Sequence, residues 1–188
     1  MVSVYCFLGY PGSGKSVAST LATERSLPVF SMGDIVRERA NEALGCDATG
    51  SAIGEFATAQ RDEHGVEVFA HAICEEIHSE ADDAERIVID GVRTPEELAV
   101  FEEEFDEVHT VFITASFETR LSRLQERGRE DEGSMTEQDL IERDAREDSW
   151  GVARVLQRDD YQTIENESSL DSFKEQVAAL LQSSEQPA

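Results

Sequence analysis

The chain has 188 residues, which is enough for one α/β domain with a substantial core and too few for two such domains. Its 41 acidic residues against 16 basic ones give a formal net charge of −25, which argues against nucleic-acid binding because phosphate contacts need a basic surface. Hydrophobic residues still make up 39% of the chain, so we expect a folded protein rather than a disordered acidic segment.

The acidic residues are spread along nearly every predicted helix, and Lys15 and Lys174 are the only lysines in the sequence. A folded domain with this balance resembles proteins of halophiles, whose surface charge keeps them soluble at high salt. The alternative is an acidic face that binds a basic partner. No apolar run approaches the ~20 residues of a membrane span, and no signal peptide is recognisable, so we expect a cytoplasmic protein without a membrane partner.

The predicted elements alternate between strands and helices. Strand 2–8 is rich in β-branched and aromatic residues, and helix 16–25 follows it after a glycine-rich turn. Strand 27–32 leads to a helix at 35–44, for which Asp34 is the expected N-cap. The later helices are predicted at 52–63, 66–79, 94–104, 116–127, 136–148 and 170–181, and the later strands at 86–90, 108–114 and 161–164.

This alternation predicts an α/β fold in which a five-stranded parallel sheet lies between two layers of helices. We expect a single domain over residues 1–182, with a helical insertion at about 45–80 and a flexible tail at 183–188. Ligands of such folds bind at the carboxyl ends of the strands.

A phosphate-binding loop is the most specific motif in the sequence. Between the first strand and the first helix lies Gly9-Tyr10-Pro11-Gly12-Ser13-Gly14-Lys15-Ser16, which fulfils the pattern G-x-x-x-x-G-K-[ST]. The glycines let backbone N–H groups turn toward phosphate oxygens, and the helix N-terminus adds partial positive charge. Lys15 is expected to reach the β- and γ-phosphates of ATP, and Ser16 to bind Mg²⁺. The alternative is a glycine-rich turn that binds nothing.

Three charged residues follow other predicted strands. Asp90 ends strand 86–90, where a carboxylate beside a phosphate loop is typical of Mg²⁺ binding, although Asp is also a common turn residue. Arg37 and Arg93 stand a few residues beyond the second and third strands, where two guanidinium groups would be able to hold the phosphate of a second substrate. The alternative is local ion pairing, of Arg37 with Asp34 and of Arg93 with the glutamates at 96 and 97.

Two of these segments resemble adenylate kinases. Residues 31–37, Ser-Met-Gly-Asp-Ile-Val-Arg, are similar to the S-x-G-D-x-x-R segment of that family, and residues 90–94 to its D-G-F-P-R-T segment, shortened by one residue. Residues 160–170 are similar to the final strand and turn of dephospho-CoA kinases, which lie near the adenine of ATP. The order of the motifs resembles a group of archaeal adenylate-kinase-like proteins of undefined substrate, within the nucleoside monophosphate kinase superfamily. The resemblance implies that Asp34, Arg37 and Arg93 bind the acceptor and that the insertion at 45–80 belongs to the acceptor site.

The resemblance also implies a short lid at about residues 120–135. Arg120, Arg123 and Arg127 fall at i, i+3 and i+7, so they share one face of helix 116–127. Arg123 and Arg127 match the R-x-x-x-R pair that begins the lid of these kinases, where the arginines stabilise charge on the transferred phosphoryl group. The alternative is a surface ladder with neighbouring glutamates.

Three histidines and one tryptophan carry weaker functional signals than the motifs above. His64, His71 and His78 recur every seven residues, but Gly65 separates the helices, so ordinary surface or partly buried histidines are favoured over a metal site. Trp150 is expected to be a packing residue, with stacking on a base as the alternative.

We interpret the sequence as that of an ATP- and Mg²⁺-dependent phosphotransferase that acts on a nucleotide-like small molecule, with Lys15, Arg93, Arg123 and Arg127 as catalytic residues. No general base is apparent, and none is needed when the acceptor is itself a phosphate. We expect a monomer or small homo-oligomer. Two alternatives stay open: phosphorylation of a hydroxyl, as in dephospho-CoA kinase, which needs a base, and an ATP-hydrolysing switch that acts on a protein partner.

Overall fold

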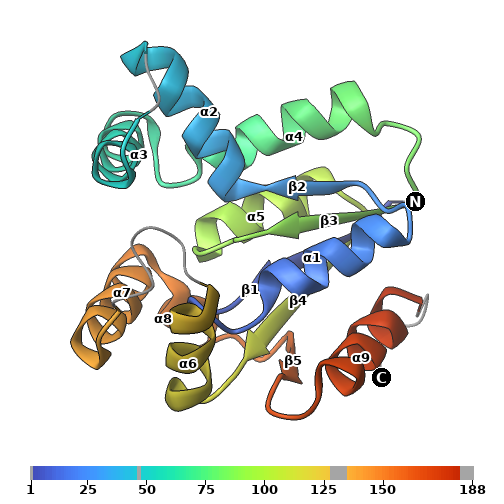
Figure 1. Ribbon diagram of the computed structural model, residues 1–188. Coiled ribbons are helices and arrows are strands. Elements are labelled where there is room, and N and C mark those ends of the chain that lie inside the picture. Colours follow the sequence, from blue (N-terminus) through green and yellow to red (C-terminus); the bar gives the residue numbers. More distant parts are fainter. Residues whose placement is uncertain (1, 46–47, 128–134, 183–188) are drawn as a thin grey trace.

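Among the residues that the computed structural model describes, 2–45, 48–127 and 135–182, five parallel strands form one sheet in the order β2-β3-β1-β4-β5 (Figure 1). The strands are β1 (Ser3–Leu8), β2 (Val29–Ser31), β3 (Arg86–Asp90), β4 (Glu107–Thr114) and β5 (Tyr161–Glu165). The helices are α1 (Lys15–Glu24), α2 (Met32–Leu44), α3 (Gly50–His64), α4 (Val68–Glu80), α5 (Pro95–Glu104), α6 (Phe117–Arg127), α7 (Glu137–Trp150), α8 (Val152–Val155) and α9 (Leu170–Gln182). The predicted α/β fold with a five-stranded parallel sheet is confirmed.

The strand order places a ligand crevice at the carboxyl end of β1. The chain leaves β1 toward β2 on one side of the sheet and leaves β4 toward β5 on the other, so the connections diverge between these neighbouring strands. Open α/β sheets bind their ligands at such a divergence. The segment between β1 and α1 therefore begins at the place where this topology expects a site.

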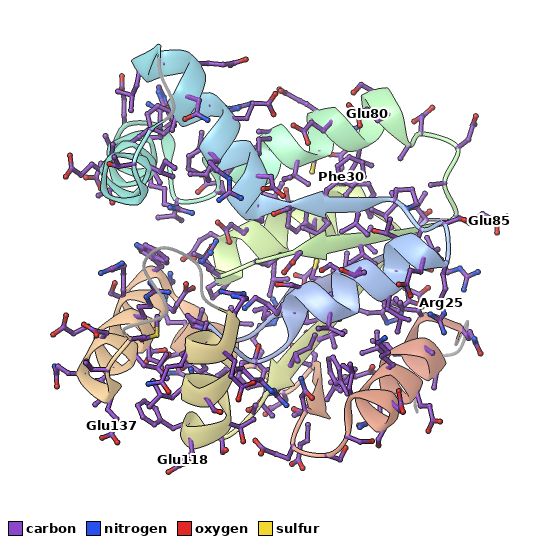
Figure 2. The ribbon with its side chains drawn as sticks, in the orientation of Figure 1. Arg25, Phe30, Glu80, Glu85, Glu118 and Glu137 are labelled. Atoms are coloured by element: carbon purple, nitrogen blue, oxygen red, sulfur yellow. The ribbon has the colours of Figure 1, made fainter. Side chains whose placement is uncertain are left out.

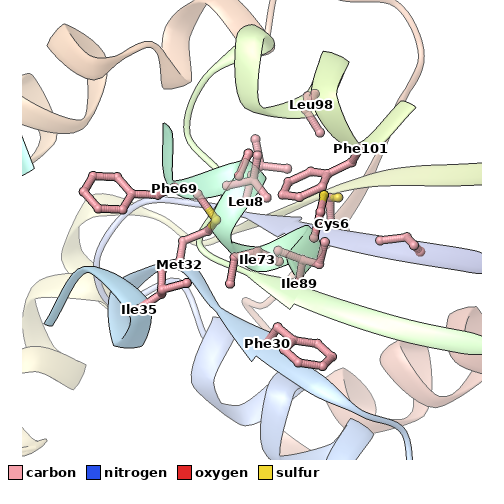
Figure 3. Packing of buried hydrophobic residues seen from close by; sticks show 14 of the residues in the cluster. Cys6, Leu8, Phe30, Met32, Ile35, Phe69, Ile73, Ile89, Leu98 and Phe101 are labelled. Atoms are coloured by element: carbon pink, nitrogen blue, oxygen red, sulfur yellow. The ribbon is translucent and has the colours of Figure 1, made fainter. Parts of the chain in front are cut away.

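Side chains of β1 alternate between two hydrophobic cores, which is the pattern of a strand covered on both faces. Cys6 and Leu8 belong to the larger core, which β1 shares with α2, α4 and α5, and Figure 3 shows them packed near Phe69, Leu98 and Phe101. Tyr5 and Phe7 face the opposite core with α1 and α9. Both cores fix β1 in the centre of the sheet, and with it the start of the glycine-rich loop.

Helix starts agree with the sequence at some positions and differ at others. Thr94 begins the predicted helix 94–104 and caps α5 in a capping box with Glu97, and Pro95 occupies the first helical position. The predicted N-cap of α2 is wrong, because that helix begins at Met32 and the Oγ of Ser31 accepts a hydrogen bond from the backbone N–H of Asp34 at 3.2 Å. Asp34 thus lies in the first turn of α2. The short helix α8 was not predicted.

Acidic side chains occupy the outside of many elements rather than one face. Glu80, Glu85, Glu118 and Glu137 are exposed on four separate segments of the chain and lie around the periphery of the molecule (Figure 2). In the part of the chain that the structure describes, no helix is both long and apolar enough to span a membrane. The predicted tail at 183–188 and the lid residues 128–134 lie outside the described residues.

Candidate functional site

The glycine-rich loop packs tightly against β4 and against the segment that follows β5. Gly9 has φ +153°, and a Cβ there would lie 2.3 Å from the carbonyl oxygen of Ile113 in β4. Gly14 has φ +116°, and a Cβ there would lie 2.3 Å from Nδ2 of Asn166, just after β5. Both positions combine left-handed backbone with a close approach, so only glycine fits without displacement of a neighbour. The loop thus has the backbone shape that turns N–H groups toward an anion.

Lys15 lies at the start of α1 and folds back over this loop. Its Nζ donates hydrogen bonds to the carbonyl oxygen of Gly9 and, at 3.4 Å, to that of Tyr10. Burial lowers the pKa of Lys15, and the nearby carboxylates of Asp90 and Glu147 act in the opposite direction. The ammonium group is therefore close to the carboxyl end of β3, where those acidic groups gather.

Asp90 ends β3 beside β1, in register with Phe7. Ser19 Oγ donates a hydrogen bond to Asp90 Oδ2 at 2.9 Å, while Asp90 Oδ1 is buried and has no hydrogen-bond partner among the described residues. A buried carboxylate oxygen without a donor is unfavourable unless a cation or water completes it. The exposed hydroxyl of Ser16 opens α1 on the same edge of the sheet, and such oxygen donors are the kind that Mg²⁺ prefers. Ser19 has no motif signal of its own.

Two contacts join the loop to α7. Arg120 is buried on α6, forms a bidentate pair with Asp144 at 2.8 and 2.6 Å, and donates to the carbonyl oxygen of Pro11 at 3.2 Å. The hydroxyl of Tyr10 donates to Asp148 Oδ1 at 2.6 Å. The sequence places Arg120 on the same helical face as Arg123. In the structure, however, the guanidinium group of Arg120 donates its hydrogen bonds to the Pro11 carbonyl oxygen of the loop and to Asp144 on α7. It positions the loop.

Arg123 reaches the segment after β5. Its Nη2 donates to the backbone oxygen of Asn166 at 2.8 Å and to Asn166 Oδ1 at 3.2 Å, and Asn166 Nδ2 donates to the carbonyl oxygen of Ser13 at 2.8 Å. Arg123 Nη1 and Ser13 Oγ are buried without hydrogen-bond partners among the described residues. Arg127 lies one turn further on and is exposed at the end of α6. The network brings Arg123 beside the loop, and the remainder of the predicted lid begins where the described residues stop.

Arg93 does not form the local side-chain pair that was the alternative to a binding role. Its Nε donates to Glu147 Oε2 on α7 at 2.8 Å, and its Nη1 donates to the carbonyl oxygen of Gly91 at 3.1 Å. Glu97 instead accepts the backbone N–H of Arg93 at 2.8 Å. The guanidinium carbon lies 5.2 Å from the ring centroid of Trp150. Arg93 is thus held at the carboxyl edge of the sheet by a residue 54 positions later in the chain.

Arg61 is a candidate site residue that the sequence did not reveal. It lies on α3, and its Nη2 is 3.4 Å from Oε1 of the buried Glu97. Its guanidinium carbon is 5.1 Å from the Phe69 ring centroid and 5.9 Å from that of Trp150. Trp150 is thus the common neighbour of Arg61 and Arg93. The stretch around Arg61 matches no motif, and only the packing of α3 brings it to this place.

Arg37 and Asp34 form the local ion pair that was the alternative to phosphate binding, and their side chains are 55% and 69% exposed. Among the described residues, Arg37 is paired with Asp34, whereas Arg93 donates to Glu147 and to the carbonyl oxygen of Gly91. Asp34 also lines a cavity of about 300 Å³ between β2, α2 and α4. The two predicted acceptor arginines thus differ in their partners: that of Arg37 is local and exposed, and that of Arg93 is on a distant helix.

The three histidines at seven-residue spacing do not converge on a metal-binding group within the described ranges. His78 Nδ1 lies 2.7 Å from the carbonyl oxygen of Cys74, and its ring stacks on Phe105 with centroids 6.2 Å apart. These contacts assign His78 to packing at the end of α4.

Comparison with known proteins agrees with this architecture. Residues 8–142 match a family model described as an AAA domain, AAA_17. The chain resembles a UPF0200 protein of Methanoculleus marisnigri, with 38% identity over 180 residues and 96% of each chain covered. A UPF0200 protein of Hyperthermus butylicus is 38% identical over 173 residues, which cover 92% of this chain and 90% of the relative.

The fold is also that of a solved kinase. A gluconokinase from Sinorhizobium meliloti superimposes with a TM-score of 0.57 at 16% identity, over 95% of this chain and 93% of the other. At that identity the likeness concerns the fold alone. The family match and the two relatives establish that the chain belongs to the UPF0200 family and contains a P-loop domain of the AAA_17 type.

Proposed function

We propose that this protein is an ATP- and Mg²⁺-dependent phosphotransferase that transfers the γ-phosphoryl group to a nucleotide-like small molecule. The observation that carries the proposal is that Ser19, one turn after Lys15 on α1, donates a hydrogen bond to Asp90 at 2.9 Å, while the buried second oxygen of Asp90 has no hydrogen-bond partner among the described residues. The phosphates of a nucleoside triphosphate require a cationic donor, and its divalent cation requires a carboxylate ligand. Lys15 and Asp90 offer both at one edge of the parallel sheet.

The loop residues would hold ATP. Backbone N–H groups of Gly9 to Ser16 would surround the phosphates, and Lys15 would exchange the carbonyl oxygens of Gly9 and Tyr10 for phosphate oxygens. Ser16 and Asp90 would hold Mg²⁺, with Ser19 fixing the orientation of the Asp90 carboxylate. When bound, Mg²⁺ neutralises charge on the β- and γ-phosphate oxygens.

Arginines would supply the remaining positive charge. Arg123, already beside Ser13 through Asn166, and Arg127 would stabilise the transferred phosphoryl group. Arg93 would hold the phosphate of the acceptor, with Arg37 and Asp34 at its outer margin. An acceptor phosphate oxygen is ionised at neutral pH, so its attack needs positioning and charge neutralisation rather than a general base.

The test is acceptor-stimulated release of ADP in molar KCl, with a panel of nucleoside monophosphates and dephospho-CoA. We expect at least one nucleoside monophosphate to stimulate ADP release about tenfold or more over the rate with ATP alone. Slow hydrolysis that no acceptor stimulates would contradict the proposal and favour the protein switch. Stimulation by dephospho-CoA alone would retain phosphoryl transfer and overturn the proposed acceptor class.

A further inference from the structure

Two arginines lie beside Trp150, and each is paired with a glutamate, so that side chains from four separate parts of the chain balance each other in charge. Arg61 comes from α3, Arg93 from the segment after β3, Glu97 from α5 and Glu147 from α7. Arg61 pairs with Glu97, and Arg93 pairs with Glu147. The two cations are near enough to affect each other: burial lowers the pKa of Arg61, Glu97 opposes this effect, and the charge of Arg93 lowers the pKa further. The cluster therefore holds two like charges together beside the proposed transfer site.

The two carboxylates of this cluster have different roles. Glu97 is fully buried and completes the capping box of α5, and it accepts backbone N–H groups of Arg93 and Thr94 at 2.8 and 3.2 Å. These bonds make Glu97 a fixed part of the fold. Glu147 retains 15% side-chain exposure, and its one side-chain hydrogen bond to the described residues is with Arg93 Nε. Glu147 is therefore the carboxylate that can move into solvent at the smaller cost.

The guanidinium groups have more donors than these carboxylates use. Arg61 Nε is buried and has no hydrogen-bond partner within the described ranges. Arg93 uses Nε for Glu147 and Nη1 for the Gly91 carbonyl oxygen, and among the described residues its Nη2 makes no hydrogen bond. Two arginine forks with spare donors beside an aromatic ring suit an anion with three acceptor oxygens better than a single carboxylate.

Resting on the function proposed above, we propose that Glu147 competes with the acceptor's phosphate for Arg93, and that a phosphomonoester dianion which displaces Glu147 is bound jointly by Arg93 and Arg61. The incoming phosphate replaces one charge-assisted hydrogen bond with several, and the released carboxylate regains its hydration. Trp150 keeps both guanidinium planes in place through its ring face.

Because of this competition, a ligand occupies the site only if it binds Arg93 more strongly than Glu147 does. Two guanidinium groups beside one ring, without an internal counter-charge, would bind any abundant anion, including chloride at high salt. With Glu147 on Arg93, a ligand must offer more charge and more acceptor oxygens than a carboxylate does. A phosphomonoester dianion meets that condition, whereas a hydroxyl or a carboxylate does not. Glu147 is thus a specificity-determining residue for the acceptor class.

Trp150 provides a direct readout because it is the only tryptophan in the sequence. We would titrate inorganic phosphate into the protein in molar KCl and follow Trp150 fluorescence, with calorimetry as a second measurement. A K15A background weakens binding at the phosphate loop. E147Q in this background should bind phosphate about tenfold more tightly than the parent. E142Q, which removes the same charge from an exposed position of α7, is the matched control and should bind as the parent does.

Arg61 is tested by R61K added to E147Q, which keeps the charge and removes the planar fork. Phosphate affinity should fall about tenfold, whereas R39K on α2, where Arg39 pairs with Glu75 at 3.9 Å, should leave it unchanged. Equal or weaker phosphate binding by E147Q than by E142Q would overturn the competition, whatever R61K does. An E147Q affinity that is insensitive to R61K would overturn the joint binding.

The same experiments separate this inference from the function on which it rests. Acceptor-stimulated ADP release by the wild type, together with unchanged phosphate affinity of E147Q, would refute the competition alone. Tighter phosphate binding by E147Q, in a protein whose wild type releases no ADP with any acceptor, would refute the phosphotransferase function alone and leave an anion site gated by Glu147.

Discussion

The phosphate loop and the cluster around Trp150 are two cationic sites at the same edge of the sheet, built in opposite ways. The loop takes its shape and its lysine from eight consecutive residues between β1 and α1. The cluster draws Arg61, Arg93, Glu147 and Trp150 from α3, the end of β3 and α7. The loop depends on local backbone conformation, and the cluster depends on the packing of distant helices. Local sequence is therefore a good guide to where ATP would bind and a poor one to how its acceptor would be chosen.

The largest effect should come from the loop. K15A is expected to lower the rate of ADP release on the order of a thousandfold, because the ammonium group would serve phosphate charge in the transition state. The thermal midpoint should change little, since the hydrogen bonds of the Lys15 ammonium group to the described residues go to carbonyl oxygens of its own loop. K174A removes the other lysine, on α9, and is the control. Near-normal turnover in K15A would show that the loop does not bind the transferred phosphate.

Replacement of Arg120, which connects the phosphate loop to α7, should have the next largest effect. R120M leaves Asp144 without its bidentate partner and the Pro11 carbonyl oxygen without a donor, so the free energy of unfolding should fall by about 3 kcal/mol. Denaturant unfolding in molar KCl measures it. R146M, at an exposed position of α7, should stay within about 0.5 kcal/mol of the wild type. Similar losses in both variants would mean that Arg120 does not connect the loop to α7.

Arg93 and Arg37 offer a direct contrast between a long-range and a local ion pair. R93Q should reduce acceptor kcat/KM by about 10- to 150-fold, the value of a charge-assisted hydrogen bond of about 1.5–3 kcal/mol, with ATP affinity nearly unchanged. R37Q should cost about fivefold or less, because its pair with Asp34 is largely exposed. An equal loss of ATP and acceptor binding in R93Q would contradict the assignment of Arg93 to the acceptor site. A larger loss of acceptor kcat/KM in R37Q than in R93Q would contradict the expected order of the two effects.

The backbone of the loop can be tested at Gly14. G14A adds a Cβ at φ +116° against Asn166 Nδ2, so we expect a loss of about 1–3 kcal/mol in the free energy of unfolding. G54A lies inside α3, where a Cβ would meet nothing within 4 Å, and should stabilise the protein by about 0.5–1 kcal/mol. Effects of the same sign would indicate that the loop conformation is not the constraint.

The smallest effect on either site should come from salt, which acts on the whole acidic surface. With a formal net charge of −25, repulsion in dilute buffer extends over about 10 Å or more, so the thermal midpoint should rise from dilute buffer to molar KCl. A flat or falling midpoint would contradict the halophile interpretation and favour an acidic face for a basic partner.

Features that depend on residues close together in the sequence were predictable, and features that depend on distant residues were not. The loop, the capping box at Thr94 and all five strands were predictable, because propensity, capping and hydrophobic alternation act over a few residues. The start of α2 was not, since Asp34 was expected to cap a helix that begins at residue 35, whereas Ser31 caps a helix that begins at Met32.

Long-range partners had no sequence signal. Ser19 joins Asp90 across 71 residues, Asn166 joins Ser13 across 153, and Arg93 joins Glu147 across 54. Each pair depends on how helices pack on the sheet, and the sequence around Arg61 does not distinguish it from an arginine at the surface. The resemblance to adenylate kinases suggested Arg93 for the proposed acceptor site but did not indicate Arg61 or Glu147 as its neighbours.

The most direct measurement follows the γ-phosphoryl group itself. The protein is incubated in molar KCl with ATP labelled in the γ-phosphate and a mixture of nucleoside monophosphates, and the products are separated. A phosphotransferase moves the label to a nucleoside diphosphate in the wild type and in K174A, while K15A yields none above the blank. Label that appears only in inorganic phosphate, at a rate independent of the monophosphates, would contradict transfer to a nucleotide-like acceptor.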